Sequence, residues 1–296
     1  MKILLLGKGG QVGWELQRSL APLGELVALD HDSTELHGNF AQPEGLRATV
    51  QAVKPDLIVN AAAHTAVDKA ESEPELARAI NATAPGVLAE EAGKLGAMLV
   101  HYSTDYVFDG SGNQPWVETD TPAPLNVYGQ TKLEGEQLVA QHCPRHLIFR
   151  TSWVYAARGG NFAKTMLKLG QERDALSVIN DQFGAPTGAE LLADVTAHAV
   201  RKLQQDGGVA GLYHLVAGGE TTWHGYARFV LETARAAGVP VKVAADAIAA
   251  VPTSAFPTPA KRPHNSRLNT RKLQDTFDVM LPDWQAGVQR MLQEIL

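Results

Sequence analysis

The sequence predicts an α/β fold in which a doubly wound parallel sheet carries a smaller C-terminal lobe. In the first 150 residues, short apolar runs of strand length alternate with helical segments. A glycine-rich turn joins the first run to the first helix. Beyond Thr151 the alternation loosens, and proline, glycine and threonine become frequent. We therefore predict a sheet domain over residues 1–150 and a lobe over residues 151–296, with a segment near 188–216 returning to the sheet domain.

The sheet elements follow in order along the chain. Apolar runs predict strands at residues 2–6, 26–29, 57–59, 98–104 and 146–150. Apolar residues at helical spacing predict helices over 11–20, 75–95 and 127–141. Because helical segments separate most of the strands, the strands are expected to run parallel. In the second half we predict helices over 191–203 and 226–236, with a strand at 212–216 between them.

Composition narrows the class of protein. The 296 residues are 45% hydrophobic and 20% charged, which is typical of a globular chain with a sizeable core. A net charge of −6 argues against non-specific nucleic-acid binding. Cys143 is the only cysteine, so neither an intrachain disulfide nor a cysteine-built zinc site is expected. We see no bilayer-spanning run and no signal-peptide core, so no membrane association is predicted and a cytoplasmic protein is the default expectation.

The glycine-rich turn predicts a dinucleotide site. Gly7, Gly10 and Gly13 form a GxxGxxG pattern between a predicted strand and a predicted helix. Missing side chains let backbone amides and the positive helix terminus approach a pyrophosphate. Asp30 ends the second strand, where a carboxylate can bind ribose hydroxyls. An ordinary turn with a strand-end aspartate is the alternative, but the combination favours a Rossmann-type site.

Tyr128 and Lys132 form a second pattern. Residues four apart share a helix face, so the ammonium can stabilise the phenolate of a tyrosine that donates a proton. The pair opens the helix after the fourth strand, whose carboxyl end carries Ser103, Thr104 and Asp105. Ligands of such sheets bind at the carboxyl ends of the strands, so these groups are expected to converge. A surface tyrosine beside a solvated lysine is the alternative.

Together these residues resemble a known family. The Gly7-x-x-Gly10-x-x-Gly13, Asn60-Ala-Ala-Ala63 and Tyr128-x-x-x-Lys132 patterns are similar to those of extended short-chain dehydrogenase/reductases. Within that superfamily the chain resembles the dTDP-4-dehydrorhamnose reductases over nearly its whole length. The narrower resemblance depends on these motifs: Ala62-Ala-His-Thr-Ala-Val-Asp-Lys69, Tyr102-Ser-Thr-Asp-Tyr-Val-Phe108, Arg150-Thr-Ser-Trp-Val-Tyr155 and Asn180-Asp-Gln-Phe-Gly-Ala-Pro-Thr187.

The resemblance implies an activity and a set of site residues. The family reduces the C4 ketone of dTDP-4-dehydro-6-deoxy-L-mannose, a dTDP-sugar, with a reduced nicotinamide cofactor. By this resemblance Tyr128 donates the proton, Lys132 holds the nicotinamide ribose and Thr104 binds the ketone oxygen. Asp105 and Trp153, with Thr104, match substrate contacts. The glycine pattern and the resemblance together give the following cofactor contacts, besides Tyr128 and Lys132: Gly7, Gly10, Gln11, Val12, Gly13, Asp30, Asn39, Phe40, Ala63, His64, Thr65 and Tyr102.

Cofactor choice, metal and assembly are further expectations. Asp30 favours NADH because it repels a 2′-phosphate, whereas the resemblance implies NADPH as well, so we predict use of both. The ten histidines show no close ligand pair, so a catalytic transition metal is not expected. The resemblance also implies a homodimer with Mg²⁺ at its interface, for which Glu15, Glu190 and Glu294 are the matching glutamates. Arg262 and Arg267 are either diphosphate ligands or ordinary surface arginines.

Two other functions stay open at this point. A sugar-nucleotide epimerase or dehydratase of the same superfamily is one, although a dehydratase normally needs a glutamate after Asp105, and Tyr106 stands there. A non-enzymatic regulatory subunit is the other, although such a protein has no need for Tyr128 and Lys132. A reductase consumes the reduced cofactor, an epimerase recycles it and a binding subunit does neither.

Overall fold

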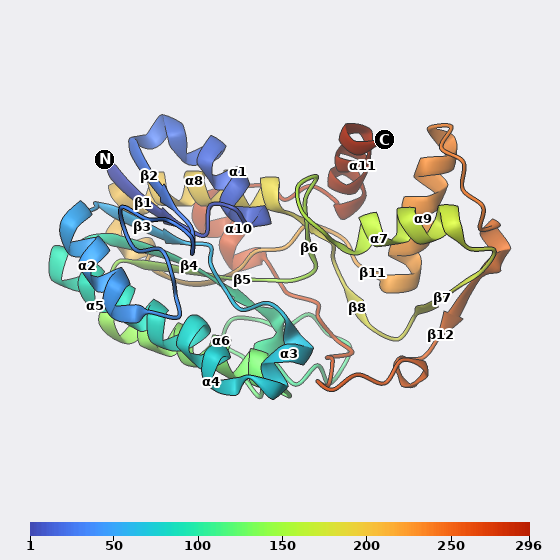
Figure 1. Ribbon diagram of the computed structural model, residues 1–296, viewed down its shortest axis with the longest axis horizontal. Coiled ribbons are helices and arrows are strands. Elements are labelled where there is room, and N and C mark those ends of the chain that lie inside the picture. The colour runs from blue at the N-terminus through green and yellow to red at the C-terminus, as the bar shows by residue number, and fades with distance from the viewer.

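A six-stranded parallel sheet forms the centre of the protein (Figure 1). The computed structural model describes residues 1–296. Across the sheet the strand order is β10-β5-β4-β3-β1-β2. The strands are β1 (Lys2–Leu6), β2 (Glu25–Leu29), β3 (Leu57–Asn60), β4 (Met98–Thr104), β5 (His146–Thr151) and β10 (Gly211–His214). The chain leaves β1 first toward β2 and then returns to β3 on its other side, so a topological switch point lies between β1 and β3. The predicted doubly wound α/β class is confirmed.

Helices cover both faces of this sheet. Ile3 and Leu5 pack in one cluster with α1 (Gln11–Leu20), α8 (Ala189–Gln205) and α10 (Arg271–Phe277). Leu4 and Leu6 point the other way, into a cluster with α2 (Pro43–Val53), α5 (Ala84–Leu95) and α6 (Val127–His142). Because successive strand residues face opposite layers that are both apolar, the strands are apolar throughout rather than alternating.

The second half of the chain builds a lobe beyond the carboxyl ends of the strands (Figure 1). Its core joins α7 (Phe162–Glu172), α9 (Trp223–Ala236) and α11 (Trp284–Ile295). Short strands pair around these helices: β6 (Val154–Tyr155) with β9 (Thr187–Gly188), β7 (Leu176–Ile179) with β12 (Ile248–Val251), and β8 (Phe183–Gly184) with β11 (Thr221–Thr222). The chain also re-enters the sheet from this half, because β10 lies beside β5 and α8 packs on α1. The division near residue 150 stays a prediction.

The helix predicted over residues 75–95 is interrupted in the structure. It consists of α4 (Pro74–Arg78), a π-helical turn (Ala79–Thr83) and α5, and follows the short helix α3 (Val67–Ser72). Pro85 explains the difference, since its ring has no N–H to donate to the carbonyl of Asn81 and would clash with it in a regular helix. The wider turn separates these groups and leaves the Asn81 carbonyl beside Gly135 of α6, where an added Cβ would lie 2.1 Å from that oxygen.

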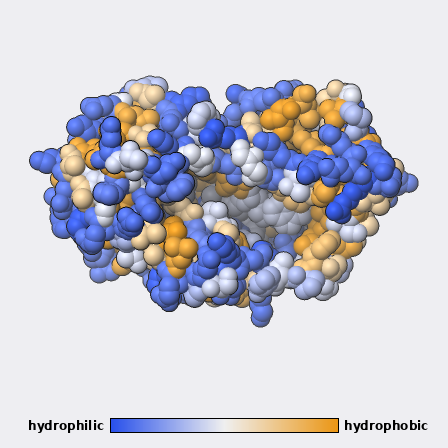
Figure 2. Space-filling model, viewed as in Figure 1, coloured by the Kyte–Doolittle hydropathy of each residue, from blue (hydrophilic) through white to orange (hydrophobic).

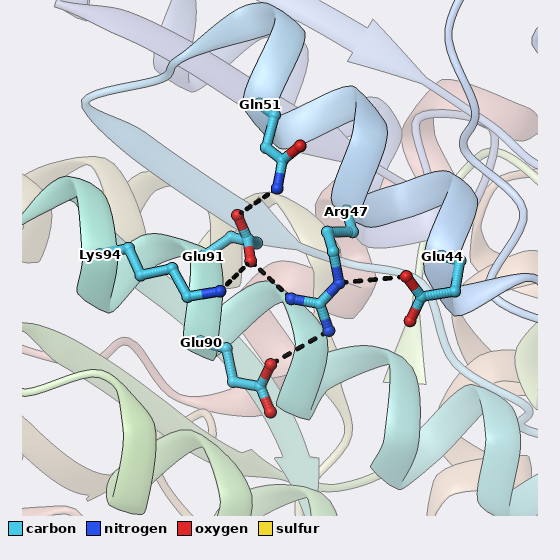
Figure 3. A network of polar contacts seen from close by, with 6 residues as sticks. All are labelled: Glu44, Arg47, Gln51, Glu90, Glu91 and Lys94. Atoms are coloured by element: carbon cyan, nitrogen blue, oxygen red, sulfur yellow. Dashed lines mark hydrogen bonds and ion pairs between the residues drawn. The ribbon is translucent and has the colours of Figure 1, made fainter.

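A network of charges joins α2 to α5 (Figure 3). Arg47 bonds Glu44 at 3.2 Å, Glu90 at 3.1 Å and Glu91 at 2.5 Å. Glu91 also accepts from Gln51 at 3.1 Å and from Lys94 at 2.6 Å. Its side chain is only 4% exposed, so these donors replace the water that a carboxylate would otherwise bind.

Two features concern the molecular surface. The space-filling view shows a hollow between the sheet domain and the lobe (Figure 2). None of the helices is both long and apolar enough to span a membrane.

Candidate functional site

A cavity of about 460 Å³ opens beside the carboxyl ends of the central strands. Twelve of the predicted cofactor residues line it: Gly7, Gly10, Gln11, Val12, Asp30, Asn39, Phe40, Ala63, Thr65, Tyr102, Tyr128 and Lys132. The cavity therefore joins the glycine turn, the end of β2, the loop after β3 and the first turns of α6. This position is the topological switch point, where ligands of doubly wound sheets bind.

The glycine turn has the geometry of a phosphate cradle. Gly7 has φ +86, a conformation that disfavours a side chain. An added Cβ on Gly13 would lie 1.9 Å from the carbonyl oxygen of Gly7, so helix and strand approach as closely as predicted. Gly10 caps α1 without any side-chain hydrogen bond, and no acidic residue stands in the first turn. The first amides of α1 are thus left available to an anion.

Asp30 stands directly beside this turn. Its carboxylate accepts from the backbone N–H of Gly9 at 2.8 Å and of His31 at 2.9 Å. Burial works to raise the pKa of Asp30, but these bonds and the His31 side chain outweigh it and lower the pKa. Asp30 is therefore ionised at neutral pH. A Cβ at Gly9 would lie 2.3 Å from a carboxylate oxygen, so this approach requires the glycine.

The loop after β3 is held from behind by Asn81, a residue that the sequence did not single out. Asn81 is 1% exposed and sits in the π-helical turn. Its side chain accepts from the N–H of His64 at 2.9 Å and donates to the His64 carbonyl at 3.1 Å and to Thr131 at 3.2 Å. The site thus depends on the local distortion that Pro85 causes, which is a common use of π turns.

Tyr128 is the second residue of α6, half-buried in the wall of the cavity. Asn126 caps this helix by accepting from the N–H of Gly129 at 2.8 Å. Burial raises the pKa of Tyr128 to about 12, hydrogen bonding to Thr104 lowers it, and the charge of Asp105 raises it. At neutral pH the phenol therefore carries the proton that a general acid must donate.

Lys132 lies one turn further along α6 and is 2% exposed. Its ammonium donates to the carbonyl of Tyr102 at 2.5 Å and lies 3.5 Å from Nε2 of His101. Burial lowers the pKa of Lys132 to about 8, and Glu136 opposes this shift. The lysine can therefore change its charge close to neutral pH. Tyr102 itself is fixed to α8, since its hydroxyl bonds Thr196 at 2.5 Å.

Thr104 ends β4 and Asp105 follows it, as predicted, but both are buried and neither lines the cavity. Thr104 is 5% and Asp105 is 2% exposed, and the Thr104 hydroxyl donates to Asp105 at 3.1 Å. Burial raises the pKa of Asp105 to about 6, although hydrogen bonds to Ser266 and Thr104 lower it. One of its oxygens, Oδ2, is buried without a hydrogen-bond partner. Of the predicted cofactor residues, Gly13 and His64 are the two that do not line the cavity.

Trp153 lies on the lobe side of the site. It adopts φ +49, which is unusual for a bulky residue and typical of strained functional positions. Its ring stacks on Trp223 at 3.7 Å between centroids. Trp223 lines a second pocket of about 300 Å³, together with Tyr106, Phe162, Phe256 and Arg262. The Trp153 ring therefore joins the end of β5 to an aromatic pocket in the lobe.

The two arginines of the late loop already have carboxylate partners. Arg262 bonds Asp68 of α3 at 2.7 Å. Arg267 bonds Glu220 at 2.6 Å and lies 4.2 Å from the centre of the Phe183 ring. Of the two, only Arg262 borders the aromatic pocket.

The three predicted metal ligands come from α1, α8 and α11. Arg290 lies 3.5 Å from Glu190 and 3.6 Å from Glu294, while Arg18 bonds Glu15 at 3.4 Å. Burial raises the pKa of Glu190, Arg290 opposes this, and Glu294 and Glu15 add to it. Within one chain no group of three or more ligands is arranged for a metal ion. The magnesium hypothesis stays a prediction.

Ser103, which the sequence placed at the carboxyl end of the fourth strand, does line the cavity. The cavity also has walls that the sequence analysis did not assign: His31, Gly38, Ala61, Ala62, Ile80, Thr151 and Val154. Thr151 ends β5, so its place at a strand terminus could have identified it. Ile80 gave no such indication, because its position depends on the π turn.

The strand order, the glycine turn at the switch point and the Tyr128–Lys132 pair define an enzyme of the short-chain dehydrogenase/reductase class. Comparison with known proteins narrows this class. The chain belongs to the family described as the RmlD substrate binding domain, which matches residues 1–296.

Relatives and solved structures agree with this assignment. A dTDP-4-dehydrorhamnose reductase of Shigella flexneri is 64% identical over 295 residues, covering 100% of this chain and 98% of the relative. The crystal structure of a dTDP-4-dehydrorhamnose reductase from Clostridium acetobutylicum matches with a TM-score of 0.89 and 34% identity, covering 100% of this chain and 99% of that one. The enzyme of that name from Bacillus anthracis, solved in complex with NADP, matches with a TM-score of 0.87 and 33% identity over 99% of both chains.

Proposed function

We propose that this protein reduces the C4 ketone of dTDP-4-dehydro-6-deoxy-L-mannose to dTDP-L-rhamnose, using NADPH or NADH. The observation that carries the proposal is a match over the full chain to reductases of this name, with the Tyr128–Lys132 pair at the cavity. When bound, the reduced nicotinamide supplies the hydride to C4. The residues of the chain supply binding, orientation and the proton.

Tyr128 is the proton donor in this proposal. Its phenol is protonated at neutral pH, so it can give its proton to the oxygen of C4 as the ketone becomes an alcohol. Thr104 acts on the phenol, since hydrogen bonding to it lowers the pKa of Tyr128, and its hydroxyl would also bind the ketone oxygen. Lys132 lies at the cavity wall, where its ammonium can bind the nicotinamide ribose and stabilise the phenolate left behind.

The cofactor residues fit a dinucleotide. The turn from Gly7 to Gly13 would hold the pyrophosphate, and Asp30 would bind the adenosine ribose hydroxyls. The ionised Asp30 favours NADH, whereas the structure of a relative contains NADP. We expect both cofactors to serve, with a preference below about a hundredfold, or about 2.7 kcal/mol.

The substrate contacts, the assembly and the location are further parts of the proposal. Asp105 and Trp153 would contact the sugar nucleotide, and the aromatic pocket beside Trp223 has space for part of it. Glu15, Glu190 and Glu294 would need a second copy of the chain to complete a Mg²⁺ site, in a cytoplasmic homodimer. Size-exclusion chromatography with and without chelator tests this, because a mass and activity unaffected by chelator would contradict the metal-linked dimer.

The decisive experiment follows nicotinamide absorbance while the purified protein acts on the ketone, generated in place by the upstream enzymes. Loss of one reduced cofactor per dTDP-L-rhamnose formed would support the proposal. Tight cofactor binding without consumption would point instead to a regulatory subunit. Turnover of a sugar nucleotide with the cofactor recycled would point to an epimerase.

A further inference from the structure

A line of buried polar groups runs behind Lys132 and is not used by the reaction as described so far. His101 on β4 is 1% exposed and Asn60 at the end of β3 is also 1% exposed. Nδ2 of Asn60 lies 3.0 Å from Nδ1 of His101, and Nε2 of His101 lies 3.5 Å from Nζ of Lys132. The lysine in turn donates to the carbonyl of Tyr102 at 2.5 Å. These contacts connect the loop after β3 to the lysine.

Backbone geometry fixes the direction of the hydrogen bonds in this line. The side-chain oxygen of Asn60 accepts from the N–H of Ala62 at 3.0 Å. If the Asn60 amide were flipped, its NH₂ group would face the N–H of Ala62, and both are donors. Asn60 must therefore present its NH₂ group to His101. Nδ1 of His101 is therefore an acceptor. Burial, and secondarily the charge of Lys132, lowers the pKa of His101, so the ring is neutral and its one proton is on Nε2.

We propose that Asn60 and His101 form a positioning pair that presents the Nε2–H of His101 to the amine of Lys132. An ammonium has three hydrogens and no lone pair, whereas an uncharged amine can accept this bond and still donate to Tyr102. Every donor and acceptor between Ala62 and Tyr102 therefore has a partner only when Lys132 is uncharged. The pair thus favours the uncharged amine of Lys132, which must take up a proton before it can act as a cation.

The other ionisable groups around Lys132 leave this role to His101. Glu136 lies one turn further along α6, but Arg150 of β5 binds both its oxygens, at 2.9 Å and 2.7 Å. Tyr128 lies one turn earlier and is neutral, and Asp105 lies beyond Thr104, which donates to it. His101 is the ionisable side chain in direct contact with the lysine nitrogen. A lysine biased in this way can take up a proton from the solvent of the cavity near neutral pH and, once charged, pass it to the phenolate of Tyr128 after each turnover.

Nitrogen NMR of ¹⁵N-histidine-labelled protein, recorded without added cofactor, tests the geometry directly. The His101 signals are assigned as those lost in His101→Gln. We expect a protonated Nε2 and a bare Nδ1 in the unchanged protein. In Asn60→Asp both side-chain oxygens are acceptors, so the tautomer should reverse. A proton on Nδ1 in the unchanged protein would overturn the inference. This measurement needs no catalysis, so it is independent of the proposed function on which the role of Lys132 rests.

The pH dependence tests the effect on Lys132. In Asn60→Asp the His101 ring has its proton on Nδ1, so its Nε2 accepts a hydrogen bond from the charged lysine and stabilises it. The fall of kcat/KM at high pH should therefore occur about one pH unit higher.

The added carboxylate also stabilises the charged lysine by its own charge. The shift in the double variant Asn60→Asp/His101→Leu measures this contribution separately. An equal shift in this double variant, or no shift in Asn60→Asp, would contradict the inference. His214→Gln changes another buried neutral histidine, one that bonds the Trp116 carbonyl instead, and should leave the pH of this fall unchanged. If the ketone is not the substrate, the pH dependence of NADH affinity can be compared among the same variants instead.

Discussion

At the scale of single residues, burial affects the protonation states of the catalytic pair more than neighbouring charges do. Burial raises the pKa of Tyr128 to about 12 and lowers that of Lys132 to about 8. Both shifts favour the uncharged form, as expected where water is excluded. The tyrosine therefore holds its proton firmly until a negative oxygen develops at the substrate, which is the behaviour required of a general acid.

Replacing Tyr128 with phenylalanine should remove the proton donor and little else. We expect turnover to fall by about 10²- to 10⁴-fold, the usual contribution of a positioned acid, while NADH still binds. The measurement is single-turnover reduction together with cofactor titration. Tyr226→Phe is the matched control, since this buried hydroxyl in the lobe core has no hydrogen-bond partner. Near-normal turnover in the Tyr128 variant would rule out its assigned role.

Asp30 should determine the balance between the two cofactors. Its carboxylate, held by the amides of Gly9 and His31, meets a 2′-phosphate with like charge. Asp30→Asn keeps the size and removes the charge, so the ratio of kcat/KM for NADPH to that for NADH should rise by about tenfold. Asp56→Asn alters an aspartate that bonds Lys2 instead and should leave the ratio unchanged. A constant ratio in Asp30→Asn would show that other groups set the preference.

At the scale of elements, the sequence was most informative where one physical cause dominates. Strands β1, β3 and β4 are buried on both faces, so apolar runs of strand length revealed them directly. The turn at Gly7 could be predicted because backbone approach excludes side chains there. The π-helical turn could not, because Pro85 indicates that a regular helix is disturbed but not which kind of turn replaces it. The short helix α2 was also missed, since it is stabilised by contacts with α5 that are remote in sequence.

The contact between α6 and the π-helical turn should be sensitive to one methyl group. In Gly135→Ala the new Cβ would overlap the carbonyl oxygen of Asn81, so the helices must separate. We expect a loss of about 1–3 kcal/mol of unfolding free energy and weaker NADH binding, because Asn81 also holds the loop at His64. Gly207→Ala is the control, since nothing lies within 4 Å of an added Cβ there. Unchanged denaturant midpoints in Gly135→Ala would contradict this packing.

The charge network of Figure 3 should give the fold part of its acid sensitivity. Burial tends to raise the pKa of Glu91, but bonds from Lys94, Gln51 and Arg47 outweigh it and lower the pKa. A group with a lowered folded pKa stabilises the fold above its unfolded pKa, and this contribution is lost as the pH falls through the folded pKa. Glu91→Gln should therefore be destabilising at pH 7 and show a shallower loss of melting temperature in acid. Exposed Glu75→Gln should leave the acid limb unchanged.

At the scale of the whole molecule, the active site depends on how the lobe is attached to the sheet domain. A hollow lies between them (Figure 2). The dinucleotide cavity is lined mostly by residues of the sheet domain, and the aromatic pocket mostly by residues of the lobe. The loop over residues 260–262 spans the two halves. Asp68 of α3 accepts from the N–H of Ala260 at 3.2 Å and from Arg262 at 2.7 Å. Asn126, the cap of the helix that carries Tyr128, donates to the carbonyl of Lys261 at 2.8 Å.

This attachment should affect the sugar nucleotide more than the cofactor. Arg262 borders the aromatic pocket, whereas neither Asp68 nor Arg262 lines the dinucleotide cavity. Asp68→Asn weakens the ion pair, so we expect KM for the sugar nucleotide to change about tenfold, equivalent to about 1.4 kcal/mol, with KM for NADH unaltered. Asp174→Asn removes an exposed pair with Lys242, neither of which lines the cavity or the aromatic pocket, and should change neither constant. If both constants rose together in Asp68→Asn, the ion pair would be maintaining the relative placement of the two halves; if neither changed, the loop would be attached through Asn126 alone. Only a selective effect on the sugar nucleotide supports a direct link between this loop and substrate binding.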